Sequence, residues 1–299
     1  MIDIFKHAGN LIKVKNLWLG LFLLKATLAF LFAVPFYLIL NATLSPSIFS
    51  RTLVSYWDIS VITEMFFGQG EIIPLYLLFI SIGVIIYALI MQYINGGLYY
   101  LFISGRIDKI NWQEFFAECG LRFNIHIKIT VFMAIVYFLL FMAGMFLINM
   151  ISLAGGHLIG GPALILMLFK LLVMFIIFLA ASIFSDSVRA SSAAYPDKQF
   201  SELLKTASSY FKPSLGKLMR AYIVTYLPFL AFWAVTEWLA LQSMGLLGGF
   251  MGIFLEFVLF QLSSSVRTGQ KLWYLSYFGG DFREKNEGRF LPEQAELAL

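Results

Sequence analysis

The sequence predicts an all-α fold, a polytopic membrane bundle of six transmembrane helices arranged as three hairpins. Composition is the first of three observations that predict it. Hydrophobic residues make up 60% of the 299 residues, charged residues only 13%, and the mean hydropathy is +0.84. Soluble domains are usually about 45–50% apolar and about 25% charged. The chain therefore has far more apolar surface than one soluble core can bury.

Long apolar stretches are the second observation. A helix needs about 20 apolar residues to cross about 30 Å of hydrocarbon. The apolar stretches of this chain are continuous, whereas the strands of a membrane barrel alternate between apolar and polar residues. We therefore predict six spanning helices, at residues 17–40, 72–94, 127–153, 162–185, 218–241 and 250–266.

The one-sided distribution of basic residues is the third observation. With a cytoplasmic N-terminus, the inside segments hold 18 of the 21 Lys and Arg residues and the outside segments hold only Arg51. Such a bias sets the orientation of membrane proteins, so both termini are expected in the cytoplasm and the chain in the inner (cytoplasmic) membrane. The net charge of +4 then reflects topology and attraction to anionic lipid headgroups, and nucleic acid is not an expected partner.

Three segments organise the predicted domain. Residues 1–277 form a single six-span membrane domain, and residues 41–71, rich in Ser and Thr, form its one sizeable external loop. From Phe278 the composition becomes abruptly polar, with several Asp, Glu, Lys and Arg residues. Residues 278–299 are therefore predicted to be a flexible cytoplasmic tail.

An internal repeat is predicted on the cytoplasmic side. Apolar residues recur there at the spacing of an amphipathic helix, just before a span. The three stripes are Met1, Ile4, Phe5, Ala8 and Ile12; Trp112, Phe115, Phe116, Cys119 and Phe123; and Phe200, Leu203, Leu204, Ala207 and Phe211. They define repeat units of about 1–103, 108–190 and 197–277, each an interfacial helix followed by a transmembrane hairpin. The interfacial helices either seal the base of the bundle or form a docking surface or lateral lipid gate.

A second repeated pattern occurs at the cytoplasmic ends of the fourth and sixth predicted spans. Ser185-Asp-Ser-Val-Arg189 matches Ser263-Ser-Ser-Val-Arg267. An arginine at a cytoplasmic helix end satisfies terminal carbonyls, favours the helix dipole and binds lipid phosphate, so Arg189 and Arg267 are candidate interface residues. Asp186 can pair with Arg189 at i, i+3, and a role in binding a substrate headgroup is the alternative.

Charged residues inside the predicted spans are the best functional candidates, because each costs at least about 2.5 kcal/mol unless it is paired or hydrated. Lys170, Glu237 and Glu256 fall at comparable depth in the outer half of the bilayer. A Glu-Lys-Glu cluster would fix helix register, or it would serve as a proton, cation or headgroup site. Lys25 lies nearer the cytoplasmic end of the first span and is expected to snorkel to the interface.

Motifs for catalysis, cofactors and metals are not found in the sequence. The histidines His7, His126 and His157 are widely scattered, and no zinc motif or glycine-rich phosphate loop is present. The single cysteine, Cys119, excludes an intrachain disulfide. We therefore expect a protein that is not an enzyme and that needs no cofactor and no metal.

One stretch resembles known families. The phrase Phe184-Ser-Asp-Ser-Val-Arg189, a short polar loop, an amphipathic helix with Phe211 and a span that begins near Arg220 resemble the membrane domain attached to some bacterial glycerophosphodiester phosphodiesterases and the similar YciC-type inner-membrane proteins. The resemblance covers roughly residues 162–241, and the usual Asp-Tyr-Ala-Arg-like phrase is here Asp186-Ser-Val-Arg189. It implies an inner-membrane helical bundle. No phosphodiesterase domain is expected, because six spans consume the chain.

Two functional hypotheses follow. In the first, the chain is a non-enzymatic membrane subunit or scaffold that organises lipids, a membrane-protein partner or further copies of itself. In the second, it is a small transporter or lipid-handling protein that uses Lys170, Glu237 and Glu256. The absence of any catalytic motif and the small number of helix-breaking prolines in the spans favour the first.

Overall fold

The computed structural model describes residues 2–44, 72–107, 110–154, 161–247 and 249–290. Within these ranges every regular element is helical, which confirms the predicted all-α class. The elements are α1 (Ile2–Lys6), the 3₁₀ helix η1 (His7–Gly9), α2 (Asn10–Lys13), α3 (Lys15–Leu44), α6 (Ile72–Ser104), α7 (Trp112–Ala154), α8 (Gly161–Ala194), α9 (Phe200–Leu247) and α10 (Gly249–Phe290).

Five of the described helices are long and apolar enough to cross a membrane. The qualifying segments are Lys15–Phe32, Leu77–Ser104, Trp112–Ile151, Pro162–Ala194 and Phe200–Gln242. The chain therefore has the character of a multi-pass membrane protein. The sixth predicted span, residues 250–266, lies on α10, which is not among the five helices, and it stays a prediction. Most of the predicted external loop falls outside the described residues.

The chain divides into two compact units, one of residues 19–91 and one of residues 1–18 together with 92–299. In the smaller unit, α3 and the first part of α6 pack side by side. The rings of Phe32 and Phe79 meet edge to face with centroids 6.1 Å apart. Gly83 admits Phe32 so closely that an added Cβ would lie 3.1 Å from its ring.

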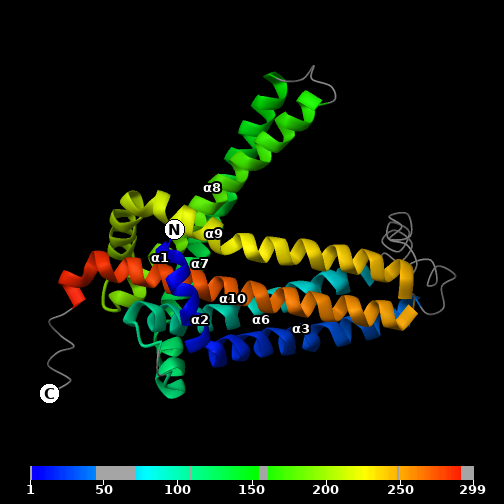
Figure 1. The fold of residues 1–299 in the computed structure, drawn as a ribbon, viewed down its shortest axis with the longest axis horizontal. Helices are drawn as coiled ribbons and strands as arrows, with labels where there is room; N and C mark the ends of the chain where they lie inside the picture. The colour runs from blue at the N-terminus through cyan, green and yellow to red at the C-terminus, as the bar shows by residue number, and fades with distance from the viewer. Residues whose placement is uncertain (1, 45–71, 108–109, 155–160, 248, 291–299) are drawn as a thin grey trace. The chain divides into compact units, whose positions relative to one another are not determined.

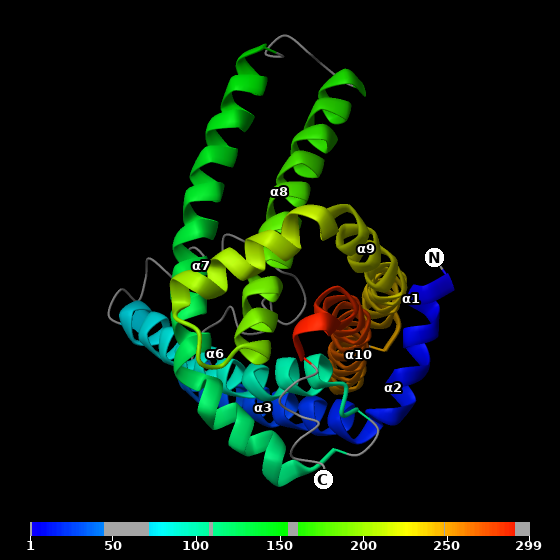
Figure 2. The same ribbon diagram turned by 90° about the vertical axis from the view of Figure 1, so that its left-hand side faces the viewer.

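The larger unit contains two helix pairs that meet at a common base. The pair α7–α8 forms one hairpin and the pair α9–α10 forms another, and the two pairs leave the base in different directions (Figures 1 and 2). The base itself is made of the end of α6, the first part of α7, the end of α8, the first half of α9 and the end of α10. Most of the buried side chains of the described residues lie there.

The length of α7 and α9 differs from the prediction. We expected an interfacial helix followed by a separate span, but each helix runs through both segments without interruption. A continuous helix satisfies its own backbone hydrogen bonds as it enters the membrane, and residues 124–128 of α7 contain no Gly or Pro that would break it. In α9, Pro213 lies inside the helix and its ribbon curves (Figure 2), because proline removes one backbone hydrogen bond.

The three predicted stripes are only partly alike in their surroundings. Ile4, Phe115 and Leu203, which occupy the same place in each stripe, are all buried. In the first stripe, however, Ile12 is exposed, whereas Phe123 and Phe211 at the same place are half-buried, and the chain there is divided into α1, η1 and α2 rather than one helix. The repeat itself stays a prediction.

The end of α10 is not the flexible tail that the composition predicts. The helix continues to Phe290, and Phe278, Asp281 and Phe282 are buried. The ring of Tyr210 on α9 lies 4.7 Å from that of Phe282, centroid to centroid. The charged residues misled the prediction because Asp281 is buried in ion pairs with Lys217 and Lys285, beside the buried rings of Phe278 and Phe282. Residues 291–299 lie outside the described part of the chain.

The N-terminal helices are fastened to the same stretch of α10. The indole N–H of Trp273 donates to the carbonyl of Ile4 at 2.8 Å. Asn10 donates to the hydroxyl of Ser276 at 2.8 Å, and the indole N–H of Trp18 donates to the carbonyl of Ser265 at 2.8 Å. These hydrogen bonds place α1 and α2 along α10.

Substituting Gly279 tests the close approach of α10 to α6. A Cβ at Gly279 would lie 2.5 Å from the backbone oxygen of Phe102, and a backbone atom cannot move aside as a side-chain end can. We expect Gly279→Ala to lower the free energy of unfolding by about 1–3 kcal/mol, measured by thermal unfolding in detergent. Gly120→Ala is the control, because nothing lies within 4 Å of its added Cβ and alanine favours helix. Equal effects at both positions would contradict the close contact.

Candidate functional site

A buried polar network lies inside the base of the larger unit. We call it the Asp186 cluster and define it by Tyr99 of α6, Asp186 and Arg189 of α8, and Lys271 of α10. Three helices that are far apart in the sequence thus bring their polar residues together near one carboxylate. Such a network in an apolar core requires good compensation of charge.

The carboxylate of Asp186 is held from two sides. The hydroxyl of Tyr99 donates a short hydrogen bond to Asp186 Oδ1, and Arg189 Nη1 lies 3.8 Å from the same oxygen. Both charged side chains are almost fully buried. The predicted pairing of Asp186 and Arg189 is therefore present, one helical turn apart.

Arg189 is oriented by neutral groups as well as by Asp186. Its Nη2 lies 3.4 Å from the side-chain oxygen of Gln92 and 3.5 Å from the hydroxyl of Thr130. Its Nε is buried and has no hydrogen-bond partner among the described residues. The guanidinium therefore keeps an unused donor inside the protein.

Lys271 brings a second positive charge toward Asp186. Desolvation is the main cause that lowers the pKa of its ammonium; Asp186 opposes that shift, and Arg189 and Arg267 add to it. The hydroxyl of Tyr274, one turn along α10, is buried without a hydrogen-bond partner among the described residues, and burial raises its pKa. The cluster therefore holds more positive charge than its single carboxylate compensates.

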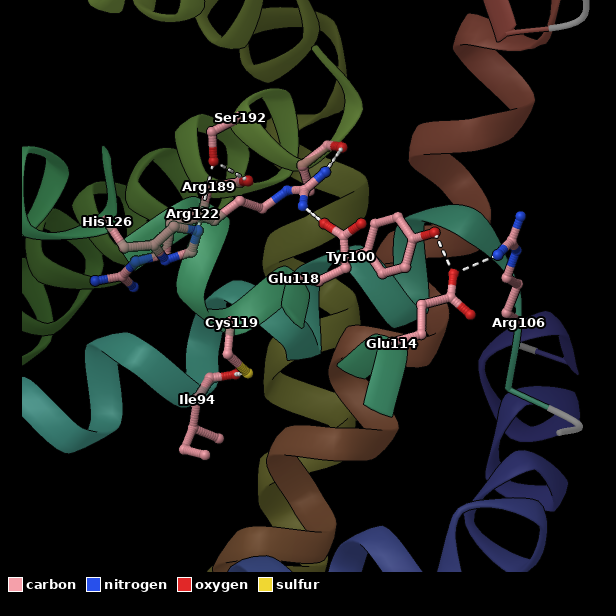
Figure 3. Close-up of polar contacts among 11 residues, drawn as sticks. Ile94, Tyr100, Arg106, Glu114, Glu118, Cys119, Arg122, His126, Arg189 and Ser192 are labelled. Carbon is pink, nitrogen blue, oxygen red and sulfur yellow. Dashed lines mark hydrogen bonds and ion pairs between the residues drawn. The ribbon is translucent and has the colours of Figure 1, made fainter. Parts of the chain in front are cut away.

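Arg122 centres a neighbouring network on α7 (Figure 3). It forms an ion pair with Glu118, donates to the carbonyl of Ala193 at 3.3 Å and lies over the ring of Tyr100, 4.9 Å from its centroid. The hydroxyl of Tyr100 donates to Glu114 at 2.7 Å. This network joins the start of α7 to the ends of α6 and α8.

His126 lies between the two networks. Its ring is fully buried, 5.9 Å from that of Tyr99, and its Nε2 is 3.5 Å from the hydroxyl of Ser192 (Figure 3). Its Nδ1 has no hydrogen-bond partner among the described residues. A structural role fits these surroundings, because the ring is fully buried and, among the described residues, Ser192 is the only side chain that hydrogen-bonds to it.

A separate carboxylate, Asp281 of α10, fastens α10 to α9. The hydroxyl of Tyr210 donates to it at 2.8 Å, Lys217 forms a short ion pair with it, and Lys285 lies 3.7 Å away. Lys285 also donates to the hydroxyl of Ser214 at 2.6 Å. Because Tyr210, Lys217 and Lys285 all bind its carboxylate, Asp281 has a structural role between α9 and α10.

The intramembrane candidates lie on three different helices, α8, α9 and α10. Lys170, Glu237 and Glu256 are all half-buried. Lys170 lies in the first half of α8, which runs beside α7 and away from α9 (Figures 1 and 2). The three-residue cluster stays a prediction.

Of the other candidates, Arg267 lies within α10, which continues to Phe290 and so does not end there as expected, and Lys25 belongs to the smaller unit. Arg267 is exposed and its guanidinium lies over the ring of Phe229, 5.9 Å from the centroid. Lys25 is half-buried and lines an apolar groove of about 470 Å³ between α3 and α6. Cys119 is buried against the carbonyl of Ile94, with its sulfur 3.9 Å from that oxygen, as a packing residue would be.

Sequence reasoning missed Tyr99, Lys271 and Asp281. The missed signal is a helical spacing of polar residues at the ends of apolar helices: Gln92, Asn95 and Tyr99 lie three to four residues apart on α6. Polar residues on one face of an otherwise apolar helix indicate a buried polar contact. Their partners on α8 and α10 are identified only by the packing.

Comparisons with known proteins give no relative. No family model, no curated protein and no solved structure matches the chain. Among the described residues, no group of three or more His, Cys, Asp or Glu side chains could hold a metal ion. The site must be interpreted from its own chemistry, which is that of a charge-rich, partly buried binding or positioning network.

Charge compensation in the Asp186 cluster can be tested with a double-mutant cycle. We expect Asp186→Asn to lower the free energy of unfolding by about 3 kcal/mol, because Arg189 and Lys271 lose their nearest carboxylate. Lys271→Met should restore part of that loss in the double variant. Thermal unfolding in detergent measures both effects, and Asp197→Asn, at an exposed position, is the control. Strictly additive effects would contradict the coupling.

The lowered pKa of Lys271 predicts a pH dependence of stability. In the unfolded chain this lysine titrates near 10.5, so between its folded and unfolded pKa values the unfolded state binds more protons. The free energy of unfolding contributed by Lys271 therefore rises with pH across that window. As the pH is raised toward 10.5, we expect the free energy of unfolding of the wild type to increase relative to that of Lys271→Met. A difference independent of pH would contradict the lowered pKa.

Proposed function

We propose that this chain is a non-enzymatic multi-pass protein of the inner membrane, with both termini cytoplasmic, that acts as a membrane subunit or scaffold. In this proposal the six predicted spans present apolar surfaces, and the base holds the helix pairs α7–α8 and α9–α10 in position. The scaffold organises lipid, a membrane-protein partner or further copies of the chain.

The proposal rests on the difference in burial between the base, whose side chains are packed, and the spans, whose side chains are mostly exposed. The largest fully buried side chains include Tyr99, Leu203, Tyr274 and Phe278, which all belong to the base. In the most apolar stretches of α6 and α8 only 6% of the residues are buried by the rest of the chain, and in that of α7 only 11%. The spans therefore offer large unpartnered surfaces, and helices in membranes associate through such surfaces by close packing.

The transporter hypothesis is supported less well. A transporter places its substrate and coupling-ion sites near the bilayer midplane, between helices that enclose them. Lys170, Glu237 and Glu256 would have to meet there, yet the first half of α8 runs away from α9 (Figure 1). The polar networks in which carboxylates pair with Arg or Lys lie instead at the base.

Affinity purification of the full chain from native membranes in mild detergent tests the proposal, with mass spectrometry of the proteins and lipids that co-purify. We expect a protein partner or a second copy in stoichiometric amount. Glu237→Gln and Lys170→Met should leave this assembly intact, because the base does not depend on either residue.

Two results would overturn the scaffold function. One is a monomer that carries no stoichiometric protein. The other is transport of a solute by the purified chain in vesicles that is lost on Glu237→Gln or Lys170→Met, which would favour the transporter instead.

A further inference from the structure

A cleft of about 510 Å³ opens at the base of the larger unit, where α7 faces the turn between α8 and α9. This volume falls within the range of small-ligand sites, about 300–1,000 Å³. Its polar lining includes Arg122 and Lys128 of α7, Ser192 of α8, and Asp197 and Lys198 of the turn. The cleft is distinct from the Asp186 cluster, although Ser192 hydrogen-bonds to His126 between them.

Arg122 is held in place at one wall of the cleft. Glu118 pairs with one end of its guanidinium, the carbonyl of Ala193 accepts from the other, and the ring of Tyr100 supports its face. The Nε of this buried side chain has no hydrogen-bond partner among the described residues. An arginine held in this way loses little conformational entropy when it binds an anion.

Two lysines extend the positive charge around the cleft. The ammonium of Lys198 lies 4.0 Å from the centroid of the Tyr195 ring and 3.4 Å from the hydroxyl of Thr206, which leaves it further donors for a ligand. Lys128 lies on α7 and is exposed. These two ammonium groups approach the cleft from α7 and from the turn.

The charge balance of the lining favours an anion. Glu118 and Arg122 compensate each other as an ion pair. Lys128 and Lys198 then outnumber Asp197 in the lining, so the cleft keeps one net positive charge. A phosphodiester carries one negative charge and presents oxygens that Arg and Lys bind well.

The apolar lining favours an amphiphile over a small soluble anion. Leu121 and Ile125 of α7 and Leu203 of α9 line the same cleft. Leu121 is 76% exposed, although it lies only one residue from buried Arg122. Because α7 continues from here into its apolar span, a lipid with its headgroup in the cleft can lay its chains along α7.

We propose that this cleft binds the phosphodiester headgroup of an anionic phospholipid. Lys128 and Lys198 contact the phosphate, Arg122 in its ion pair with Glu118 forms the fixed polar wall behind it, and Leu121 and Ile125 contact the adjoining acyl chains. The inference deepens the lipid-organising part of the proposed function and rests on it.

Binding of three probes to the purified full-length chain in detergent tests the site. The probes are short-chain phosphatidylglycerol, inorganic phosphate and short-chain diacylglycerol, measured by native mass spectrometry and by titration. We expect the phosphatidylglycerol to bind and Lys128→Gln/Lys198→Gln to weaken it at least about tenfold, since each charge-assisted hydrogen bond contributes about 1.5–3 kcal/mol. The matched control is Lys205→Gln/Lys212→Gln, at two exposed lysines of α9 outside the lining.

Each other outcome overturns a stated part of the proposal. Equal loss in the control variant, or no loss in the cleft variant, removes the site. Inorganic phosphate that binds as tightly as the lipid assigns the cleft to a soluble phosphate, and diacylglycerol that binds as tightly removes the role of the phosphate. Thermal unfolding of both variants is measured as well, to check that each is folded. Lipid binding by a chain that purifies without a protein partner would retain the cleft and reject the scaffold.

Discussion

The packing of residues 272–282 of α10 is the interaction on which the base depends. This stretch places Tyr274, Phe278 and Phe282 against α9, and the tightest contact is that of Gly279 with the backbone of α6. It also receives the N-terminal helices through Trp273 and Ser276. Burial of aromatic side chains contributes the largest share of such packing. Without this stretch the ends of α6 and α9 and the N-terminus would lose their common partner.

A base packed in this way determines what its polar groups can do. Charges that are removed from water interact strongly with one another and are costly when uncompensated. Asp281 is fully compensated by Tyr210, Lys217 and Lys285, so it fastens two helices. The Asp186 cluster instead carries an excess of positive charge through Arg189 and Lys271, and the lining of the cleft beside Arg122 also carries one net positive charge. The base is thus a positively charged platform at the end of apolar helices.

This separation of roles relates the fold to the proposed function. The described spans bury few of their apolar residues against the chain itself, and their lipid-exposed surfaces are free to meet lipid or protein. The base supplies the rigidity and the charge. In the proposed function, a platform that holds helix pairs and binds anionic headgroups next to them would organise its surroundings in the membrane.

The sequence by itself determined the helical class and the membrane character, because hydropathy and helix length are local properties that residues 72–94 or 162–185 display without their neighbours. It also identified the pairing of Asp186 with Arg189, which a single helical turn dictates. Only the tertiary structure decided that Tyr99 and Lys271 join that pair, and that the stretch with Phe278, Asp281 and Phe282 belongs to a packed helix rather than to a tail. Both depend on contacts between helices distant in sequence, which composition and periodicity do not encode. The direction of each helix pair was decided in the same way: the depth of a span follows from the sequence, but the packing at the base makes the first half of α8 run away from α9 (Figure 1).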